Sequence, residues 1–185
     1  IVHENFLRRV PAQDFPVGDS PVETLEPADA LSVFRAQVLS RALDLQSRVM
    51  QKQGQGFYTI GSSGHEGMAA VGHALRVDDM AFLHYRDAAF QIARAGKAGH
   101  EGIMRDMLLS FACAAEDPTS GGRHKVLGSR PLMIPPQTST IASHLPKAVG
   151  AAHSIGLARR KRPEHAVLPR DGIVMCSFGD ASLNH

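Results

Sequence analysis

Two short polar segments, each placed directly after an apolar run, hold the side chains best suited to chemistry. Tyr85 and Arg86 follow the apolar run 80–83, and Asp180 follows the apolar run 172–178. A guanidinium holds phosphate oxygens through paired hydrogen bonds, and a tyrosine hydroxyl adds one more. An aspartate flanked by glycine can give Mg²⁺ one hard oxygen ligand, and Mg²⁺ commonly bridges to phosphates. Together the two segments predict a site for a ligand that carries a diphosphate.

Each of these signals also has an ordinary structural interpretation when it stands alone. A Tyr-Arg pair is more often a surface pair, and Gly-Asp after a strand is often only a turn. The shared position is what favours a site, because ligands of open parallel sheets bind beyond the carboxyl ends of the strands. The helix that we expect to open after Asp87 would add backbone amides near a bound anion.

The elements that must position these residues indicate an α/β fold. Apolar residues at helical spacing predict five helices, which begin at Pro27, at Ser63 (capped with Glu66), after Asp87 (ending at Gly96), at Ile103 and at Leu145. The last of them should run to about Arg160. In the first helix the buried apolar face is expected at Leu31, Phe34, Val38, Leu39, Ala42, Leu45 and Val49.

Continuous apolar runs at 80–83 and 172–178 predict strands that are covered on both faces. The predicted fold class is therefore a three-layer parallel sheet with helices on both faces. Residues 1–26 lack a sustained period and are interpreted as an extended arm, whereas 27–185 are assigned to one domain. Residues 115–139 are predicted to form a long irregular loop, and loops of that length usually carry function.

Composition argues against several classes of protein. The net charge is only +2, and the one dense basic run, 159–162, closes a predicted helix, so nucleic acid is not an expected partner. No segment has the length of a membrane span, and the first residues do not resemble a signal peptide. Cys113 and Cys176 are interpreted as reduced, buried thiols of a cytosolic protein. Zinc-ligand spacing is absent from the histidines His65, His73, His84, His100 and His124.

Four segments, in order, resemble the alpha subunits of thiamine-diphosphate-dependent 2-oxo acid dehydrogenases, the branched-chain and pyruvate enzymes. The third segment is the most specific, because its length and its Pro-x-Ala-Val-Gly ending both match. The resemblance runs from about residue 27 to the end of the chain and implies the thiamine-diphosphate-binding fold. The segments are GSSGHEG (61–67), FLHYRD (82–87), QTSTIASHLPKAVGAA (137–152) and FGDAS (178–182).

The resemblance assigns site residues segment by segment. The cofactor diphosphate would be bound by His84, Tyr85 and Arg86, and the aminopyrimidine ring would meet Ser139 and Ile141. The first half of the cofactor motif would comprise Gly179, Asp180, Ala181 and Ser182, with Asp180 as the Mg²⁺ ligand. A structural monovalent cation in some relatives implies a similar role for Thr138, Ser143 and His144. Ala181 replaces a usual glycine and His144 a usual glutamine.

The implied activity is oxidative decarboxylation of a 2-oxo acid with thiamine diphosphate and Mg²⁺, followed by acyl transfer to a lipoyl-bearing partner. A branched-chain substrate such as 2-oxoisovalerate is favoured, and pyruvate or acetoin enzymes are the alternatives. The implied assembly pairs the chain with a beta subunit or a fused beta half, as a heterotetramer or fused homodimer, in the bacterial cytoplasm or the mitochondrial matrix.

Two further expectations concern the chain as it stands. It is interpreted as an incomplete domain that stops within its cofactor motif, so it should be an apo form with the 115–139 loop poorly ordered. His65 is the one candidate catalytic residue, with an interface role as its alternative. A non-catalytic fragment that serves only in assembly or binding is the competing hypothesis of another class.

Overall fold

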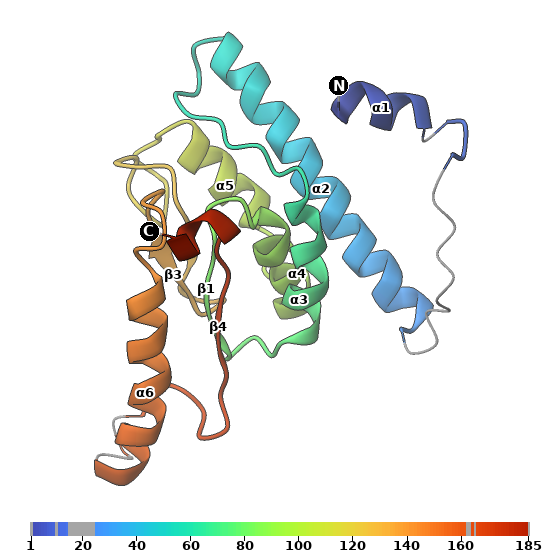
Figure 1. Ribbon diagram of the computed structural model, residues 1–185. Helices are drawn as coiled ribbons and strands as arrows, with labels where there is room; N and C mark the ends of the chain where they lie inside the picture. Colours follow the sequence, from blue (N-terminus) through green and yellow to red (C-terminus); the bar gives the residue numbers. More distant parts are fainter. Residues whose placement is uncertain (1, 10, 15–24, 162–163, 165, 185) are drawn as a thin grey trace.

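The fold combines helices with short strands, in a computed structural model that describes residues 2–9, 11–14, 25–161, 164 and 166–184 (Figure 1). Its helices are α1 (Val2–Arg9), α2 (Pro27–Lys52), α3 (Met68–Ala74), α4 (Ala88–Ala98), α5 (Ile103–Phe111) and α6 (Leu145–Lys161). Two 3₁₀ helices are η1 (His65–Gly67) and η3 (Asp180–Asn184). The strands are β1 (Met80–Phe82), β2 (Leu127–Ser129), β3 (Ile134–Gln137) and β4 (Val174–Cys176). These bounds confirm the helices predicted from Pro27, Ile103 and Leu145, and a strand in each apolar run.

The strands form two small sheets rather than one large one. β1 and β4 pair in parallel, with Met80 opposite Val174 and Phe82 opposite Cys176, which confirms the predicted parallel arrangement. β2 and β3 pair antiparallel, and the amide of Ala81 donates to the Met133 carbonyl beside that hairpin. The predicted three-layer sheet is therefore too large for the described residues, which supply only two parallel strands.

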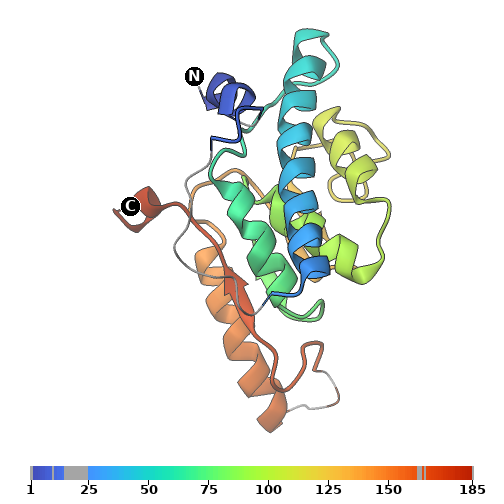
Figure 2. The same ribbon diagram turned by 90° about the vertical axis from the view of Figure 1, so that its right-hand side faces the viewer.

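Helices lie around the parallel pair on more than one side (Figures 1 and 2). α6 packs against β1 and β4, while α2, α3 and α4 pack on one another. Gly72 of α3 makes a very close contact, because a Cβ there would lie 2.5 Å from the Phe90 carbonyl oxygen of α4. Cover on both faces of β4 is incomplete, since all three of its residues are only half-buried. Cys113 and Cys176 are free thiols and half-buried rather than fully buried.

The buried face of α2 differs from the predicted one. Leu31, Phe34, Val38 and Val49 lie between 44% and 68% exposed, whereas the buried residues are Ala36, Ser40, Leu43, Asp44, Ser47 and Met50. The reason is a set of polar partners that periodicity cannot detect. Asp44 accepts from Arg41, Arg48 and the amide of Ser62, so a carboxylate is stabilised on the buried face.

This change of face gives a direct stability test. We expect Leu43→Ala to lower the free energy of unfolding by about 2–4 kcal/mol, because it empties a buried volume. Phe34→Ala, on the exposed stripe of the same helix, should cost less than about 0.5 kcal/mol. Urea unfolding of the two variants measures both values. Equal losses would contradict the observed orientation of α2.

Three local predictions were also wrong. Residues 2–9 of the expected extended arm form α1, where Glu4 in the first turn and Arg8 and Arg9 in the last suit the helix dipole. Ser63 does not cap a helix with Glu66, because its hydroxyl accepts from Arg41 and η1 intervenes before α3. α4 continues past Gly96 to Ala98, where Gly99 adopts a left-handed conformation. The boundary at residue 26 stays a prediction, and 15–24 lie outside the described residues.

The 115–139 segment is only partly irregular. The β2–β3 hairpin occupies its second half, and its first half is an ordered turn organised by buried Asp117. Asp117 accepts from the amides of Thr119 and Ser120 at 2.9 and 3.1 Å. Side chain to backbone bonds of this kind define a turn that apolar periodicity cannot reveal. The predicted long irregular loop therefore contains a hairpin and a hydrogen-bonded turn, and the expectation that it is poorly ordered stays a prediction.

Candidate functional site

The carboxyl ends of β1 and β4 open at one edge of the parallel pair. The amide of Ser177 donates to the Phe82 carbonyl at 3.0 Å, so the two chains stay together beyond the strands. A Cβ added at Gly179 would lie 3.7 Å from His84 Nε2 and 3.9 Å from Ser182 Oγ. The two segments that carry the predicted diphosphate and metal residues thus meet at this edge, as the strand order demands.

The side chain of Asp87 connects the segments that meet at this edge. Its carboxylate is completely buried and accepts from the His65 Nδ1–H at 2.6 Å, the Ser177 hydroxyl and the His84 amide at 3.2 Å. The His65 tautomer is assigned from this partner. Although Asp87 stands at the N-cap position of α4, its side chain does not cap that helix. Asp87 instead joins the η1 segment to the ends of both parallel strands through these hydrogen bonds.

His84 lies buried between aromatic and basic neighbours. Its ring stacks on the His65 ring at 4.9 Å and lies 3.9 Å from the Tyr85 ring, and its Nδ1 accepts from the Arg86 amide at 3.3 Å. Burial lowers the pKa of His84, and nearby Asp87 only partly opposes that effect. The imidazole is therefore neutral at pH 7, with one nitrogen already fixed as an acceptor.

The lowered pKa of His84 predicts acid-sensitive folding. The unfolded chain binds a proton at His84 more tightly than the folded chain does. The contribution of neutral His84 to the free energy of unfolding is therefore complete above the ordinary histidine pKa of about 6.5 and is lost as pH falls below it. We expect the melting temperature to fall more between pH 7 and pH 5.5 in the wild type than in His84→Gln. His153→Gln, at an exposed position of α6, serves as the control. Equal falls in the wild type and His84→Gln would contradict this account.

Arg86 leaves most of its guanidinium available. One NH1 bond goes to the Gly61 carbonyl at 2.8 Å, and the guanidinium carbon lies 5.2 Å from the Tyr85 ring centre. Its other guanidinium N–H groups make no hydrogen bond to the residues that the structure describes. The half-buried side chain is thus oriented by one contact and retains donors for an anion.

The segment between β3 and α6 reaches the same edge through buried His144. His144 Nε2 donates to the Ser177 carbonyl at 2.7 Å. Ser139 Oγ lies 3.4 Å from His124 Nε2, and Ile141 is mostly exposed. Ser143 and Thr138 bond within the segment, to the carbonyl and the amide of Thr140. The proposed roles of these residues toward a pyrimidine ring or a monovalent cation stay predictions.

The Gly179–Ser182 segment follows β4 and enters η3 at Asp180. Asp180 and Ala181 are exposed, whereas Ser182 is buried and its amide donates to the Gly179 carbonyl at 3.0 Å. An exposed carboxylate at the start of this turn has oxygens free to bind a hard cation. The role of Asp180 as a Mg²⁺ ligand stays a prediction.

Sequence reasoning missed the closeness of His65, His84 and Asp87. One ligand-capable atom from each lies within 4.8 Å of the others. Positions 65, 84 and 87 match no metal-ligand spacing, so the only available signal was the polar content of GHE and HYRD. His65, the candidate catalytic residue, is oriented by Asp87, and its Nε2 makes no hydrogen bond to the described residues.

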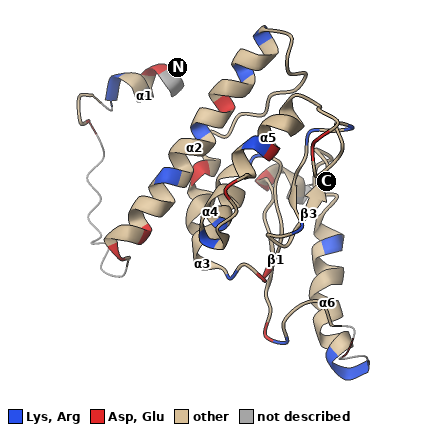
Figure 3. Ribbon diagram, turned by 180° about the vertical axis from the view of Figure 1, so that it is seen from behind, with Lys and Arg blue, Asp and Glu red and all other residues tan. Residues whose placement is uncertain are grey.

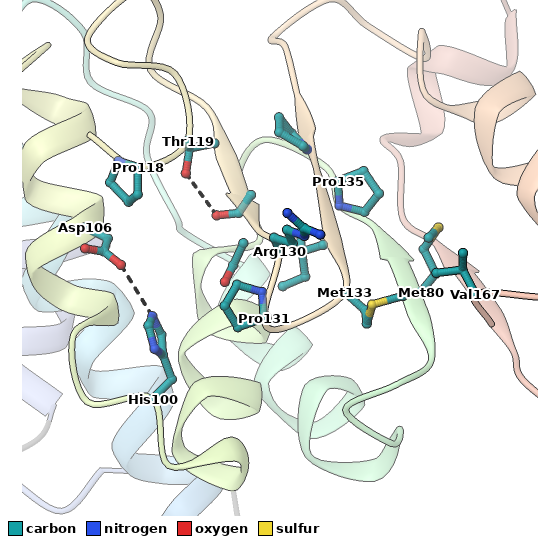
Figure 4. A pocket seen from close by; sticks show the side chains of 14 residues that line it. Met80, His100, Asp106, Pro118, Thr119, Arg130, Pro131, Met133, Pro135 and Val167 are labelled. Atoms are coloured by element: carbon teal, nitrogen blue, oxygen red, sulfur yellow. Dashed lines mark hydrogen bonds and ion pairs between the residues drawn. The ribbon is translucent and has the colours of Figure 1, made fainter. Parts of the chain in front are cut away.

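A cavity of about 590 Å³ lies elsewhere, at the amino end of β1 (Figure 4). Pro131, Met133 and Pro135 form part of its lining, with Arg130 inside and a His100–Asp106 pair at one side. It contains no residue of the predicted site. The volume of a cavity therefore does not show where the side chains suited to chemistry lie. The strand-end edge remains the candidate site because polar and charged groups converge there.

Charge and hydropathy add two observations. Basic side chains are spread along α2, where acidic ones are interspersed, and gather again at the end of α6 (Figure 3). No helix among the described residues is both long enough and apolar enough to cross a membrane.

Comparison with known proteins finds a distant similarity to an enzyme subunit. No family profile matches this chain. The chain is similar to the 2-oxoisovalerate dehydrogenase subunit alpha of Bacillus subtilis (strain 168), with 27% identity over 161 residues. The match covers 84% of this chain and 44% of the relative, so the chain spans less than half of the length of that protein.

Proposed function

We propose that this chain is the cofactor-binding part of a 2-oxo acid dehydrogenase alpha subunit, and that it binds thiamine diphosphate with Mg²⁺. The distant similarity to a 2-oxoisovalerate dehydrogenase alpha subunit supports the family. The meeting of the HYR and GDAS segments at one edge of the β1–β4 pair carries the proposal. A diphosphate needs cationic donors and a metal-binding carboxylate, and these segments contain both types.

The described residues fit such a ligand in the chemistry of their donors. Arg86 has unused guanidinium N–H groups, and neutral His84 and the Tyr85 hydroxyl stand beside it. Asp180 is exposed and has a carboxylate available for Mg²⁺. We assign the diphosphate to His84, Tyr85 and Arg86, the metal to Asp180, and the rest of the first half-motif to Gly179, Ala181 and Ser182. Ser139 and Ile141 are assigned to the aminopyrimidine ring.

Bound thiamine diphosphate would supply the electron sink that decarboxylation of a 2-oxo acid requires. The work of this chain is binding and orientation. Arg86 would compensate phosphate charge and Asp180 would hold Mg²⁺, while Asp87 fixes the positions of His65 and His84. His65 is oriented by a buried carboxylate and keeps Nε2 available, which suits proton transfer beside the cofactor.

Our proposals for the substrate and the partners are based on the similarity to the dehydrogenase subunit. We propose a branched-chain 2-oxo acid of the 2-oxoisovalerate type, with pyruvate or acetoin as the alternatives, and transfer of the acyl group to a lipoyl-bearing partner. A beta subunit or fused beta half would complete the active site, in a heterotetramer or fused homodimer of the bacterial cytoplasm or mitochondrial matrix. The cation role of Thr138, Ser143 and His144 belongs to the same proposal.

Calorimetric titration with thiamine diphosphate and Mg²⁺ tests the binding role. We expect Arg86→Ala to weaken binding by about 2–3 kcal/mol, the scale of a lost charge-assisted hydrogen bond. Arg130→Ala, in the cavity at the other end of β1, should leave the affinity unchanged. Equal affinities of the wild type and Arg86→Ala would remove Arg86 from the diphosphate site. Absence of binding by the wild type would favour a non-catalytic assembly fragment.

A further inference from the structure

The cavity at the amino end of β1 has the size and the lining of a site for a small molecule. Its volume of about 590 Å³ lies within the range of roughly 300–1,000 Å³ that ligand sites occupy. Four prolines and two methionines contribute to its walls, so most of the lining is apolar. Walls of this kind favour a ligand with an apolar body, because contact removes apolar surface of both partners from water.

The turn that carries Arg130 into this cavity is held in place by two other elements. The Met133 amide donates to the Arg130 carbonyl at 3.1 Å, and the Met133 carbonyl accepts from the Ala81 amide of β1 at 3.0 Å. Arg94 of α4 is completely buried and donates to the Leu132 carbonyl of the same turn at 3.1 Å. The wall is therefore formed before a ligand arrives, which lowers the cost of binding.

The Arg130 guanidinium has no acceptor of its own. It makes no hydrogen bond and no ion pair with the residues that the structure describes, and Figure 4 shows the side chain within the ring of lining residues. Arg130 is exposed, so a ligand can reach the guanidinium from solvent. A cation that stands free among apolar walls is suited to an anionic group attached to an apolar body.

The acidic groups at the cavity have donors already. Among the lining residues the other ionisable groups are His100 and Asp106, whose Nε2 and Oδ2 lie 3.4 Å apart at one side of the cavity (Figure 4). Directly before β1, the buried carboxylate of Asp79 accepts from the Ile173 amide at 2.8 Å and pairs with Arg76 at 3.2 Å. Arg130 is therefore the charged group of the lining that is available to a ligand.

We propose that this cavity binds an aliphatic monocarboxylate, with its carboxylate on the Arg130 guanidinium and its hydrocarbon chain against the prolines and methionines. A guanidinium can donate two parallel hydrogen bonds to one carboxylate. A phosphate fits less well, because more charge would have to leave water beside apolar walls. Straight-chain fatty acids and short branched acids share the chemistry that this site recognises. The proposal does not depend on the proposed function, whose residues lie at the other end of β1.

Calorimetric titration of the full chain with octanoate tests the inference. We expect octanoate to bind, and octylamine, with the same chain and the opposite charge, to bind at least about tenfold more weakly. Arg130→Met should weaken octanoate binding by about tenfold to a hundredfold, as the loss of a hydrogen bond to a charged group predicts. Arg35→Met removes the same charge at an exposed position of α2 and should leave the affinity within about twofold of the wild type.

Two further measurements on the wild type need no variant and place the ligand. In NMR spectra, octanoate should shift the ring signals of His100, which lines the cavity, and leave those of His84 unchanged. Isocaproate, a short branched acid, should cause the same shift. Tighter binding of octanoate would identify a fatty acid as the source of the ligand, and tighter binding of isocaproate a short branched acid. Either result supports the site.

Several outcomes would overturn the proposal. Equal affinities of the wild type and Arg130→Met for octanoate would remove Arg130 from the site, and equal affinities for octanoate and octylamine would exclude a carboxylate site. Absence of binding by both acids, together with a dimer in analytical ultracentrifugation, would assign the cavity to a second copy of the chain. Octanoate binding as expected without any binding of thiamine diphosphate would contradict the proposed function alone.

Discussion

Asp180→Asn is expected to abolish the magnesium-dependent part of cofactor binding while the protein stays folded. Asp180 is exposed, so its replacement should change the free energy of unfolding by less than about 0.5 kcal/mol. Affinity for thiamine diphosphate in the presence of Mg²⁺ should fall by more than about a hundredfold, because even groups that only orient a metal ligand account for 10–100-fold. Calorimetry with and without Mg²⁺ measures this difference.

The contrast between metal and no metal is the decisive part of that experiment. Without Mg²⁺ the wild type and Asp180→Asn should bind the cofactor equally and weakly, through Arg86 and its neighbours. Ala181→Gly, which restores the residue usual at this place in the motif, should bind as well as the wild type. A magnesium effect of equal size in wild type and Asp180→Asn would show that another group holds the metal.

Asp87→Ala is expected to lower the free energy of unfolding by about 3–5 kcal/mol, the range for breaking a buried charged network. The substitution leaves the His65 Nδ1–H and the Ser177 hydroxyl without their acceptor, and it removes one of the two acceptors of the His84 amide, which also donates to Ser177 Oγ at 2.8 Å. Those donors come from three segments of the chain, so both stability and the arrangement of the candidate site depend on one carboxylate. Urea unfolding gives the value.

Two further variants sharpen the Asp87 result. Asp87→Asn keeps the shape of the side chain but turns an NH₂ group toward one of the three donors, so its cost should be intermediate. Asp78→Ala removes an exposed carboxylate near Arg76 and should cost less than about 1 kcal/mol. A loss of less than about 1 kcal/mol in the free energy of unfolding for Asp87→Ala would mean that the three donors find other partners. Asp87 would then not be the residue that holds the three segments together.

The sequence was sufficient to predict the parts of the fold that depend on local pattern. Apolar continuity identified β1 and β4, and helical spacing located α2, α5 and α6. Parallel pairing followed from the same continuity and is confirmed by the register of Met80 with Val174. From that pairing alone, the HYR and GDAS segments were expected at one edge, and they lie there, since a Cβ added at Gly179 would be 3.7 Å from His84 Nε2.

The parts that sequence could not predict depend on partners distant along the chain. The buried face of α2 includes Asp44, and this is stable only because Ser62 and two arginines supply donors. α4 was expected to open after Asp87, but nothing in the sequence indicated that the Asp87 carboxylate accepts from residues at positions 65, 84 and 177. The cavity at the amino end of β1 was not predicted at all, because its lining comes from segments as distant along the chain as Met80 and Arg130.

The central claim is that the ends of β1 and β4 hold a single diphosphate–metal site. Binding of Mn²⁺ in place of Mg²⁺, with thiamine diphosphate present, tests this claim by the paramagnetic broadening of histidine ring signals in NMR spectra. The account predicts that the His84 signal disappears at a lower Mn²⁺ concentration than the signal of His100, which lines the cavity at the other end of β1. Preferential loss of the His100 signal, or equal loss of both, would contradict it.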